Sequence, residues 1–175
     1  MKTEIRIHGL NEIRRAMLQL PQRLDNKLLN KGLLAGAQVV RDEARTRAPI
    51  LKQETPRRRA GVLRRAISAM RVRPVRYAAT AIVRVRNLTT RQISAFKRKS
   101  GKGGAANPRD PFYWRFVEFG TSKMAAIPFL RPAFDRKKET AVRVAIATLK
   151  PLVEAEIAKL GAASRAVTNL LRVTR

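Results

Sequence analysis

A long run of apolar residues at helical spacing in the first third of the chain sets the strongest limit on how this sequence folds. In residues 23–47 these side chains form a wide stripe, which predicts an amphipathic helix covered along one face. Gly32 and Gly36 lie on the stripe, four residues apart. Because a glycine inside a helix costs about 1 kcal/mol relative to alanine, we expect a second element to pack closely there. Ala48 and Pro49 end the helix.

A second long helix is predicted in the last third of the chain. Pro132 suits its first turn, and an apolar seam runs from Val142 to Leu160. Pro151 lies within the seam, so we expect a kink or a break there. Gly161 ends the regular pattern, and residues 162–175 are interpreted as a weakly amphipathic tail.

Short alternating runs between these helices predict strands. Residues 70–72 and 79–85 alternate apolar and polar side chains around a turn at 74–77, which predicts an antiparallel hairpin with an arginine-bearing face. Alternation in residues 2–7 predicts a first strand, and a short helix is expected at 11–20. The order strand, helix, helix, strand, strand, helix, helix predicts an α+β fold, with helices packed on one face of a small antiparallel sheet. We expect residues 1–161 to form a single domain.

The segment 88–110 has no apolar periodicity and is rich in glycine and lysine, so we expect a long basic loop or mobile arm. The aromatic segment that follows places Phe112, Phe116 and Phe119 on one helical face. Gly120 suits the position just past a helix end.

The charge balance restricts the partners of the chain. It contains 39 Lys and Arg residues against 12 Asp and Glu, a net charge of +27. Self-repulsion at this charge destabilises a compact chain, so a partner that neutralises it is expected. That partner is either a polyanion or an acidic protein neighbour in an assembly.

The positive charge is concentrated between Arg57 and Arg115, where 17 Lys or Arg residues accompany a single acid, Asp110. No base-reading motif is present, so we expect at most a non-specific phosphate contact. DNA and an acidic protein stay open as alternatives for these side chains. The candidate contact residues are Arg57, Arg58, Arg59, Arg71, Arg73, Arg84, Arg86, Lys97, Arg98, Lys99 and Lys102.

Catalytic chemistry is poorly represented in the sequence. There are no cysteines, and the one histidine, His8, stands apart from any acid cluster. No phosphate-binding loop and no zinc or calcium spacing is found, so we expect no enzyme activity, no cofactor and no metal. No signal peptide is present and no apolar run approaches the roughly 18 residues that span a bilayer, so we expect a soluble protein that does not bind membranes.

Two separated motifs resemble a known family. The first comprises Ala48-Pro49 and the later Ala60-Gly61-Val62-Leu63-Arg64, in which alanine replaces the usual threonine. The second comprises residues 117–121 and 127–134, Val-Glu-Phe-Gly-Thr and Ile-Pro-Phe-Leu-Arg-Pro-Ala-Phe. In this order they resemble the phage HK-ninety-seven gene-product-ten-like family of tail-completion or head–tail joining proteins, related in role to the lambda minor tail protein Z.

The resemblance implies an α+β structural subunit of a homo-oligomeric ring, expected to be a hexamer, in the virion neck or tail. Its neighbours would be the connector or stopper and the tail terminator or tail tube, with double-stranded DNA in the lumen. Assembly would take place in the host cytoplasm. The implied subunit or partner interface consists of Glu118, Phe119, Gly120, Thr121, Pro128, Phe129, Arg131 and Pro132.

For the second motif, a purely structural interpretation is favoured over a direct partner contact, and in a ring protein the two do not exclude each other. In it Glu118 caps a turn, Gly120 permits that turn, and Phe129 and Phe134 fill the core. Glu118 could also pair with an arginine across a subunit boundary.

Two other functions compete with a neck protein. A non-specific nucleic-acid-binding protein of nucleoid or ribosomal type would explain the net charge of +27. A toxin or nuclease would have to depend on His8, which alone is a poor catalytic set.

Overall fold

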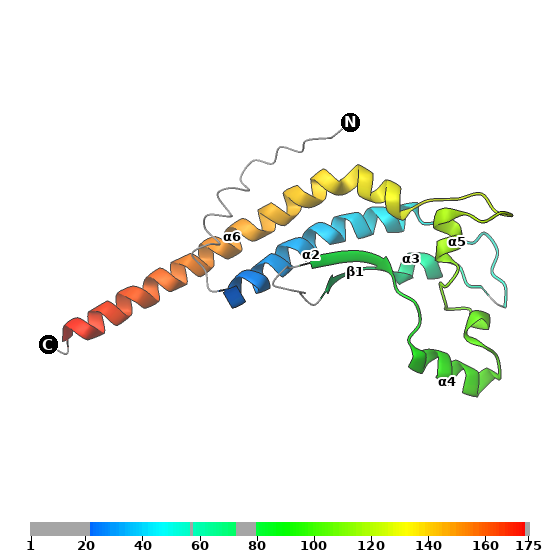
Figure 1. Cartoon of the computed structure of the whole chain (residues 1–175), viewed down its shortest axis with the longest axis horizontal. Coiled ribbons are helices and arrows are strands. Elements are labelled where there is room, and N and C mark those ends of the chain that lie inside the picture. The colour runs from blue at the N-terminus through cyan, green and yellow to red at the C-terminus, as the bar shows by residue number, and fades with distance from the viewer. Residues whose placement is uncertain (1–21, 57, 73–79, 174–175) are drawn as a thin grey trace. The chain divides into compact units, whose positions relative to one another are not determined.

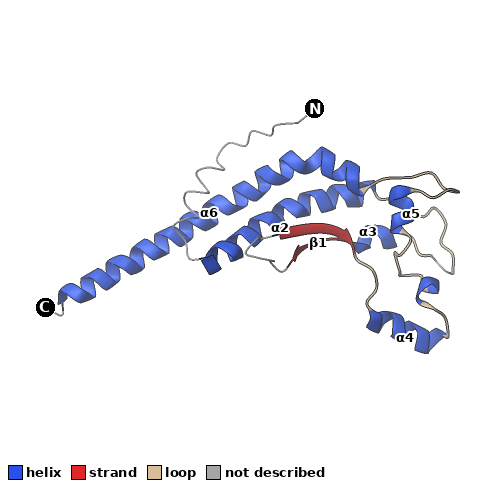
Figure 2. Cartoon of the chain, viewed as in Figure 1, coloured by secondary structure: helices blue, strands red, loops and turns tan. Residues whose placement is uncertain are grey.

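The computed structural model describes residues 22–56, 58–72 and 80–173, and the predicted α+β class is confirmed (Figures 1 and 2). The strand expected at 2–7, the helix at 11–20 and the turn at 74–77 lie outside the described residues. The elements in chain order are α2 (Gln22–Arg47), α3 (Val62–Ala66), β1 (Ile67–Val72), β2 (Thr80–Val85), α4 (Thr90–Ser100), the 3-10 helix η1 (Gly104–Ala106), α5 (Trp114–Phe119) and α6 (Leu130–Val173).

The chain divides into two compact units, which are described separately. The first comprises Met1–Gly36, Arg71–Ala81 and Glu139–Arg175, and the second comprises Ala37–Met70 and Ile82–Lys138. A single domain over residues 1–161 stays a prediction. No helix in the described part of the chain is long and apolar enough to cross a membrane.

In the first unit, the first half of α2 packs against α6, as the two glycines predict. A Cβ on Gly32 would overlap the Leu149 side chain, and one on Gly36 would lie 2.6 Å from the Ala141 carbonyl oxygen. The small core of this unit is built by Leu28, Leu149 and Val153, with Leu29, Leu152 and Ile157 packed against it.

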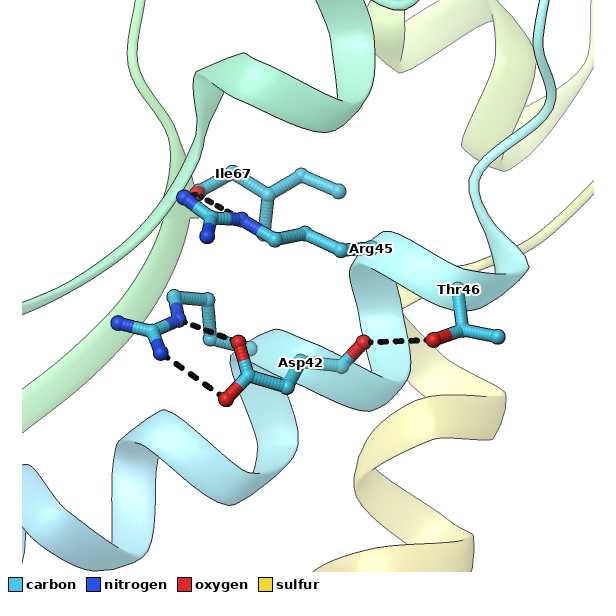
Figure 3. Close-up of polar contacts among 5 residues, drawn as sticks. Asp42, Arg45, Thr46 and Ile67 are labelled. Carbon is cyan, nitrogen blue, oxygen red and sulfur yellow. Dashed lines mark hydrogen bonds and ion pairs between the residues drawn. The ribbon is translucent and has the colours of Figure 1, made fainter.

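In the second unit, the core gathers small and β-branched residues around one phenylalanine. The C-terminal turns of α2 are fixed to it by arginines: Arg45 donates through Nε and Nη2 to the Ile67 carbonyl oxygen at 3.1 and 2.8 Å (Figure 3). Arg64 donates to the carbonyl oxygens of Ala48 and Thr46. Carbonyl groups at the C-terminal end of a helix have no N–H donor within the helix, so Arg64 supplies the missing donors. The core residues are Ala44, Ala48, Leu63, Ile67, Val85, Phe129 and Ala133.

The sheet is the predicted hairpin, a two-stranded antiparallel pair of β1 and β2. β1 begins three residues earlier than the alternation indicates, because Ile67 is fully buried and already extended directly after α3.

Three segments differ from the sequence-based expectations. Helix α4 occupies residues 90–100 of the basic loop expected at 88–110. Helix α6 continues through Pro151, so the expected break is wrong, whereas a kink stays a prediction. Pro151 is exposed and lies between the buried Leu149 and Val153, which pack on both sides of it. Helix α6 also continues through Gly161 to Val173, so the expected tail is helical over most of its length.

Candidate functional site

The candidate site is built around Glu118, whose carboxylate caps the start of α6. Its Oε2 accepts hydrogen bonds from the backbone N–H groups of Phe129 at 2.8 Å and Leu130 at 3.0 Å, and its Oε1 from Arg131 at 3.0 Å. N–H groups in a first helical turn have no intrahelical acceptor, and a negative charge there also meets the positive end of the helix dipole. The structural interpretation of Glu118 is therefore confirmed.

Gly120 makes the turn between α5 and α6 possible. Its φ is 74° and its ψ is 179°, a conformation open in practice only to glycine. A Cβ there would lie 2.9 Å from Ala126 N and 3.0 Å from the Met124 carbonyl oxygen. Thr121 and Met124 then exchange two backbone hydrogen bonds, at 2.9 and 3.2 Å, which close the loop.

This ordered connection carries large apolar side chains into solvent. Phe119 is 64% exposed and Phe116 49%, both on α5. The loop adds Met124 and Ile127, and the Ile127 N–H bonds to the Val117 carbonyl at 2.8 Å, which fixes it beside α5. Large apolar side chains held exposed on an ordered backbone are candidates for a partner-binding surface. We call Phe116, Phe119, Met124, Ile127 and Phe134 the apolar set.

Phe134 was expected in the core, and that interpretation is wrong. It is 56% exposed, whereas its neighbour Ala133 is fully buried. Successive residues of a helix point about 100° apart, so Ala133 takes the core position and Phe134 is turned away from it.

A groove of about 640 Å³ lies beside Glu118. Its lining carries two arginines, Arg131 and Arg136, and two carboxylates, Glu118 and Asp135, so its formal charge is balanced. Its walls are Glu118, Phe119, Ala126, Pro128, Arg131, Pro132, Asp135 and Arg136.

The structure separates the predicted interface residues into three roles. Phe119, Pro128, Arg131 and Pro132 line the groove, and Gly120 and Thr121 form the turn beside it. Phe129 is fully buried, so it supports the surface from beneath and does not itself face a partner.

The predicted basic residues differ in role and in exposure. Arg58 is structural: its guanidinium lies 4.9 Å from the Phe112 ring centroid and 5.4 Å from that of Tyr113, and it donates to the Ala105 carbonyl at 3.2 Å. Burial raises the pKa of the Tyr113 hydroxyl, which Arg58 partly offsets. Of those that the structure describes, Arg71 belongs to the first unit and the others to the second. Arg57 and Arg73 lie outside the described residues, whereas Arg59, Arg71, Arg84, Arg86, Lys97, Arg98, Lys99 and Lys102 are exposed.

Helix α4 is the element that the sequence interpretation missed. Thr89 and Gln92 form a capping box, in which the Gln92 N–H donates to Thr89 Oγ1 at 3.3 Å and the Thr89 N–H to Gln92 Oε1 at 2.9 Å. Gly101 ends the helix with φ 66°. The Thr-x-x-Gln pattern was a readable signal for this start. In the described ranges, no group of three His, Cys, Asp or Glu side chains could hold a metal ion.

Comparison with known proteins gives one match. A family model described as "Bacteriophage HK97-gp10, putative tail-component" matches residues 11–120 of the chain. The match extends through α5 to Gly120. No curated protein and no solved structure matches the chain.

Proposed function

Because the chain belongs to the HK97-gp10-like family of bacteriophage tail components, we propose that it is a structural virion protein of the neck or tail. In this role it is a tail-completion or head–tail joining subunit that docks the tail to the capsid connector. It forms a homo-oligomeric ring, a hexamer by the resemblance of its motifs, and borders the DNA channel. It acts by binding and not by catalysis.

The apolar set carries this proposal. A capping carboxylate, a glycine-specific turn and paired backbone hydrogen bonds hold Phe119 and Ile127 in a defined place, although neither side chain stabilises the core of its own unit. Exposed aromatic and aliphatic anchors on an ordered backbone are typical of protein–protein binding sites. The groove beside them adds charged side chains of both signs, Arg131, Arg136 and Asp135, as a polar rim for a protein neighbour.

The first test is the number of copies of this chain in purified phage particles, measured by quantitative mass spectrometry. A low number near a multiple of six supports a neck or tail ring. Absence from particles contradicts the proposal and favours the alternative, a free nucleic-acid-binding protein of nucleoid or ribosomal type.

Substitutions then test the docking surface. The double variant Phe119→Ser/Ile127→Ser is expected to fold and to be lost from particles. The matched control is Ile50→Ser/Leu51→Ser, which removes two exposed apolar side chains, 47% and 37% exposed, outside the apolar set. Equal incorporation of both double variants would contradict the assignment of the docking surface.

A further inference from the structure

Helix α4 has two chemically different faces. Ile93 and Phe96 are half-buried, and Ile93 lies against η1, where a Cβ on Gly104 would sit 3.1 Å from Ile93 Cγ2. The positions i, i+3, i+4 and i+7 share another face of the helix. On α4 these positions are all exposed, and they are Arg91, Ser94, Ala95 and Arg98.

The stability of α4 does not explain Arg91. Lys97, Arg98 and Lys99 lie in the last turn, where cations interact favourably with the helix dipole. Arg91 lies in the first turn, which has no acidic residue, and a positive charge there is unfavourable to the helix. Among the ion pairs of the described residues, none involves a cation of α4. Arg91 and Arg98 are therefore available to a ligand.

The chemistry of this face distinguishes between the two kinds of partner that a basic helix can have. Protein interfaces are anchored by buried aromatic or large apolar side chains, and the exposed face of α4 has none. Phosphate contacts are made by arginine, lysine and serine, and small side chains let the backbone come close. Residues 86–109 contain seven Lys or Arg residues and no Asp or Glu.

We infer that α4 binds the phosphate backbone of double-stranded DNA through Arg91, Ser94 and Arg98. Lys97, Lys99 and Lys102 add non-specific attraction from the end of the helix. The inference deepens the proposed function and rests on it for the place where DNA meets the chain. The contact itself is tested on the isolated full-length chain, so its failure is separate from failure of incorporation into particles.

The experiment is a salt titration of binding to a fluorescent mixed-sequence duplex of about 20 base pairs, followed by anisotropy. Each phosphate contact contributes about 0.9 to the slope of log K against log salt, so Arg91→Gln/Arg98→Gln should lower the slope by about 1.8. Between about 50 and 200 mM salt, the variant should then lose about 12-fold less affinity than the parent chain. Neither side chain is buried, so the circular dichroism spectrum should be unchanged.

The matched control is Lys52→Gln/Arg143→Gln, which removes two exposed cations outside α4. Its slope should stay at the parent value. Equal slopes for the two double variants would mean that overall charge drives the binding, and the inference would be overturned. Tighter binding to poly-glutamate than to the duplex would also overturn it and would assign the face to an acidic protein.

Discussion

The carboxylate of Glu118 accepts the backbone N–H of Phe129 at 2.8 Å, so the last turn of α5 is bonded directly to the residue that precedes α6. The same carboxylate also takes the N–H groups of Leu130 and Arg131. Because one buried group satisfies three donors, Glu118 decides where α6 begins. Phe119 and the groove are therefore positioned by a buried contact within the chain, which a partner would not touch.

Removing this carboxylate should be strongly destabilising. Glu118→Ala leaves three N–H groups at the start of α6 without their acceptor, and we expect a loss of about 2–4 kcal/mol in the free energy of unfolding. Glu118→Gln keeps one acceptor oxygen for Phe129 and Leu130 but loses the charge and turns an NH2 group toward the Arg131 N–H, and should cost less than Glu118→Ala. Urea denaturation measures both. The control is Glu54→Gln, since the exposed Glu54 accepts one N–H, from Ala60 at 3.0 Å. A similar cost for Glu54→Gln and Glu118→Ala would contradict the capping role.

Two glycines with nearly equal φ should respond very differently to alanine. Gly101→Ala meets no atom within 4 Å, so only the left-handed backbone opposes it, at about 1 kcal/mol. Gly120→Ala would press its Cβ onto the Ala126 and Met124 backbone as well, and should cost about 2–4 kcal/mol. Thermal unfolding of the two variants compares them directly. Equal melting temperatures would show that the loop adjusts freely around Gly120.

The sequence predicts those parts of the molecule in which a residue pattern has a single local physical cause. The apolar stripe predicts α2, because a helix that faces a core repeats apolar residues at helical spacing. Gly32 and Gly36 predict its close packing, because a residue without a Cβ lets a second helix approach. Helix α4 was not predicted, because it buries no residue and its sequence therefore shows no core-facing apolar period. Its start depends on the Thr89–Gln92 capping box alone.

The exposed apolar surface could not be predicted for a different reason. An apolar residue looks the same in a sequence whether its own chain or a partner covers it. Phe129 and Phe134 belong to one motif, yet one is fully buried and the other is 56% exposed. The two phenylalanines differ only in whether the backbone directs the side chain toward the core or away from it.

The close packing of the first unit gives a further prediction, at Gly36. Alanine there gains helix propensity of about 1 kcal/mol, yet its Cβ would lie 2.6 Å from the backbone oxygen of Ala141, which cannot rotate away. We expect a net loss of about 1–3 kcal/mol from Gly36→Ala in urea denaturation. Gly32→Ala would press its Cβ onto Cγ and both Cδ atoms of the buried Leu149 and should be destabilising as well. A stabilising Gly36→Ala would mean that the two helices separate easily.

The acid sensitivity of the second unit should depend on Glu43. Its carboxylate accepts Arg47 Nε at 2.7 Å, and Arg136 Nε and Lys137 Nζ each lie 4.0 Å away. The hydrogen bond from Arg47, assisted by the other cations, holds the pKa of Glu43 below its ordinary value. A carboxylate with a lowered pKa in the folded state contributes stability above its unfolded pKa and loses it as pH falls through the folded one. Glu43→Gln should therefore lower the urea midpoint at about pH 7 and have a smaller effect at about pH 3.

The control is Glu139→Gln, at an exposed carboxylate for which the described chain has no ion pair, and it should have little effect at either pH. An effect of Glu43→Gln that is the same at both pH values would show that the charge of Glu43 is not what stabilises the unit.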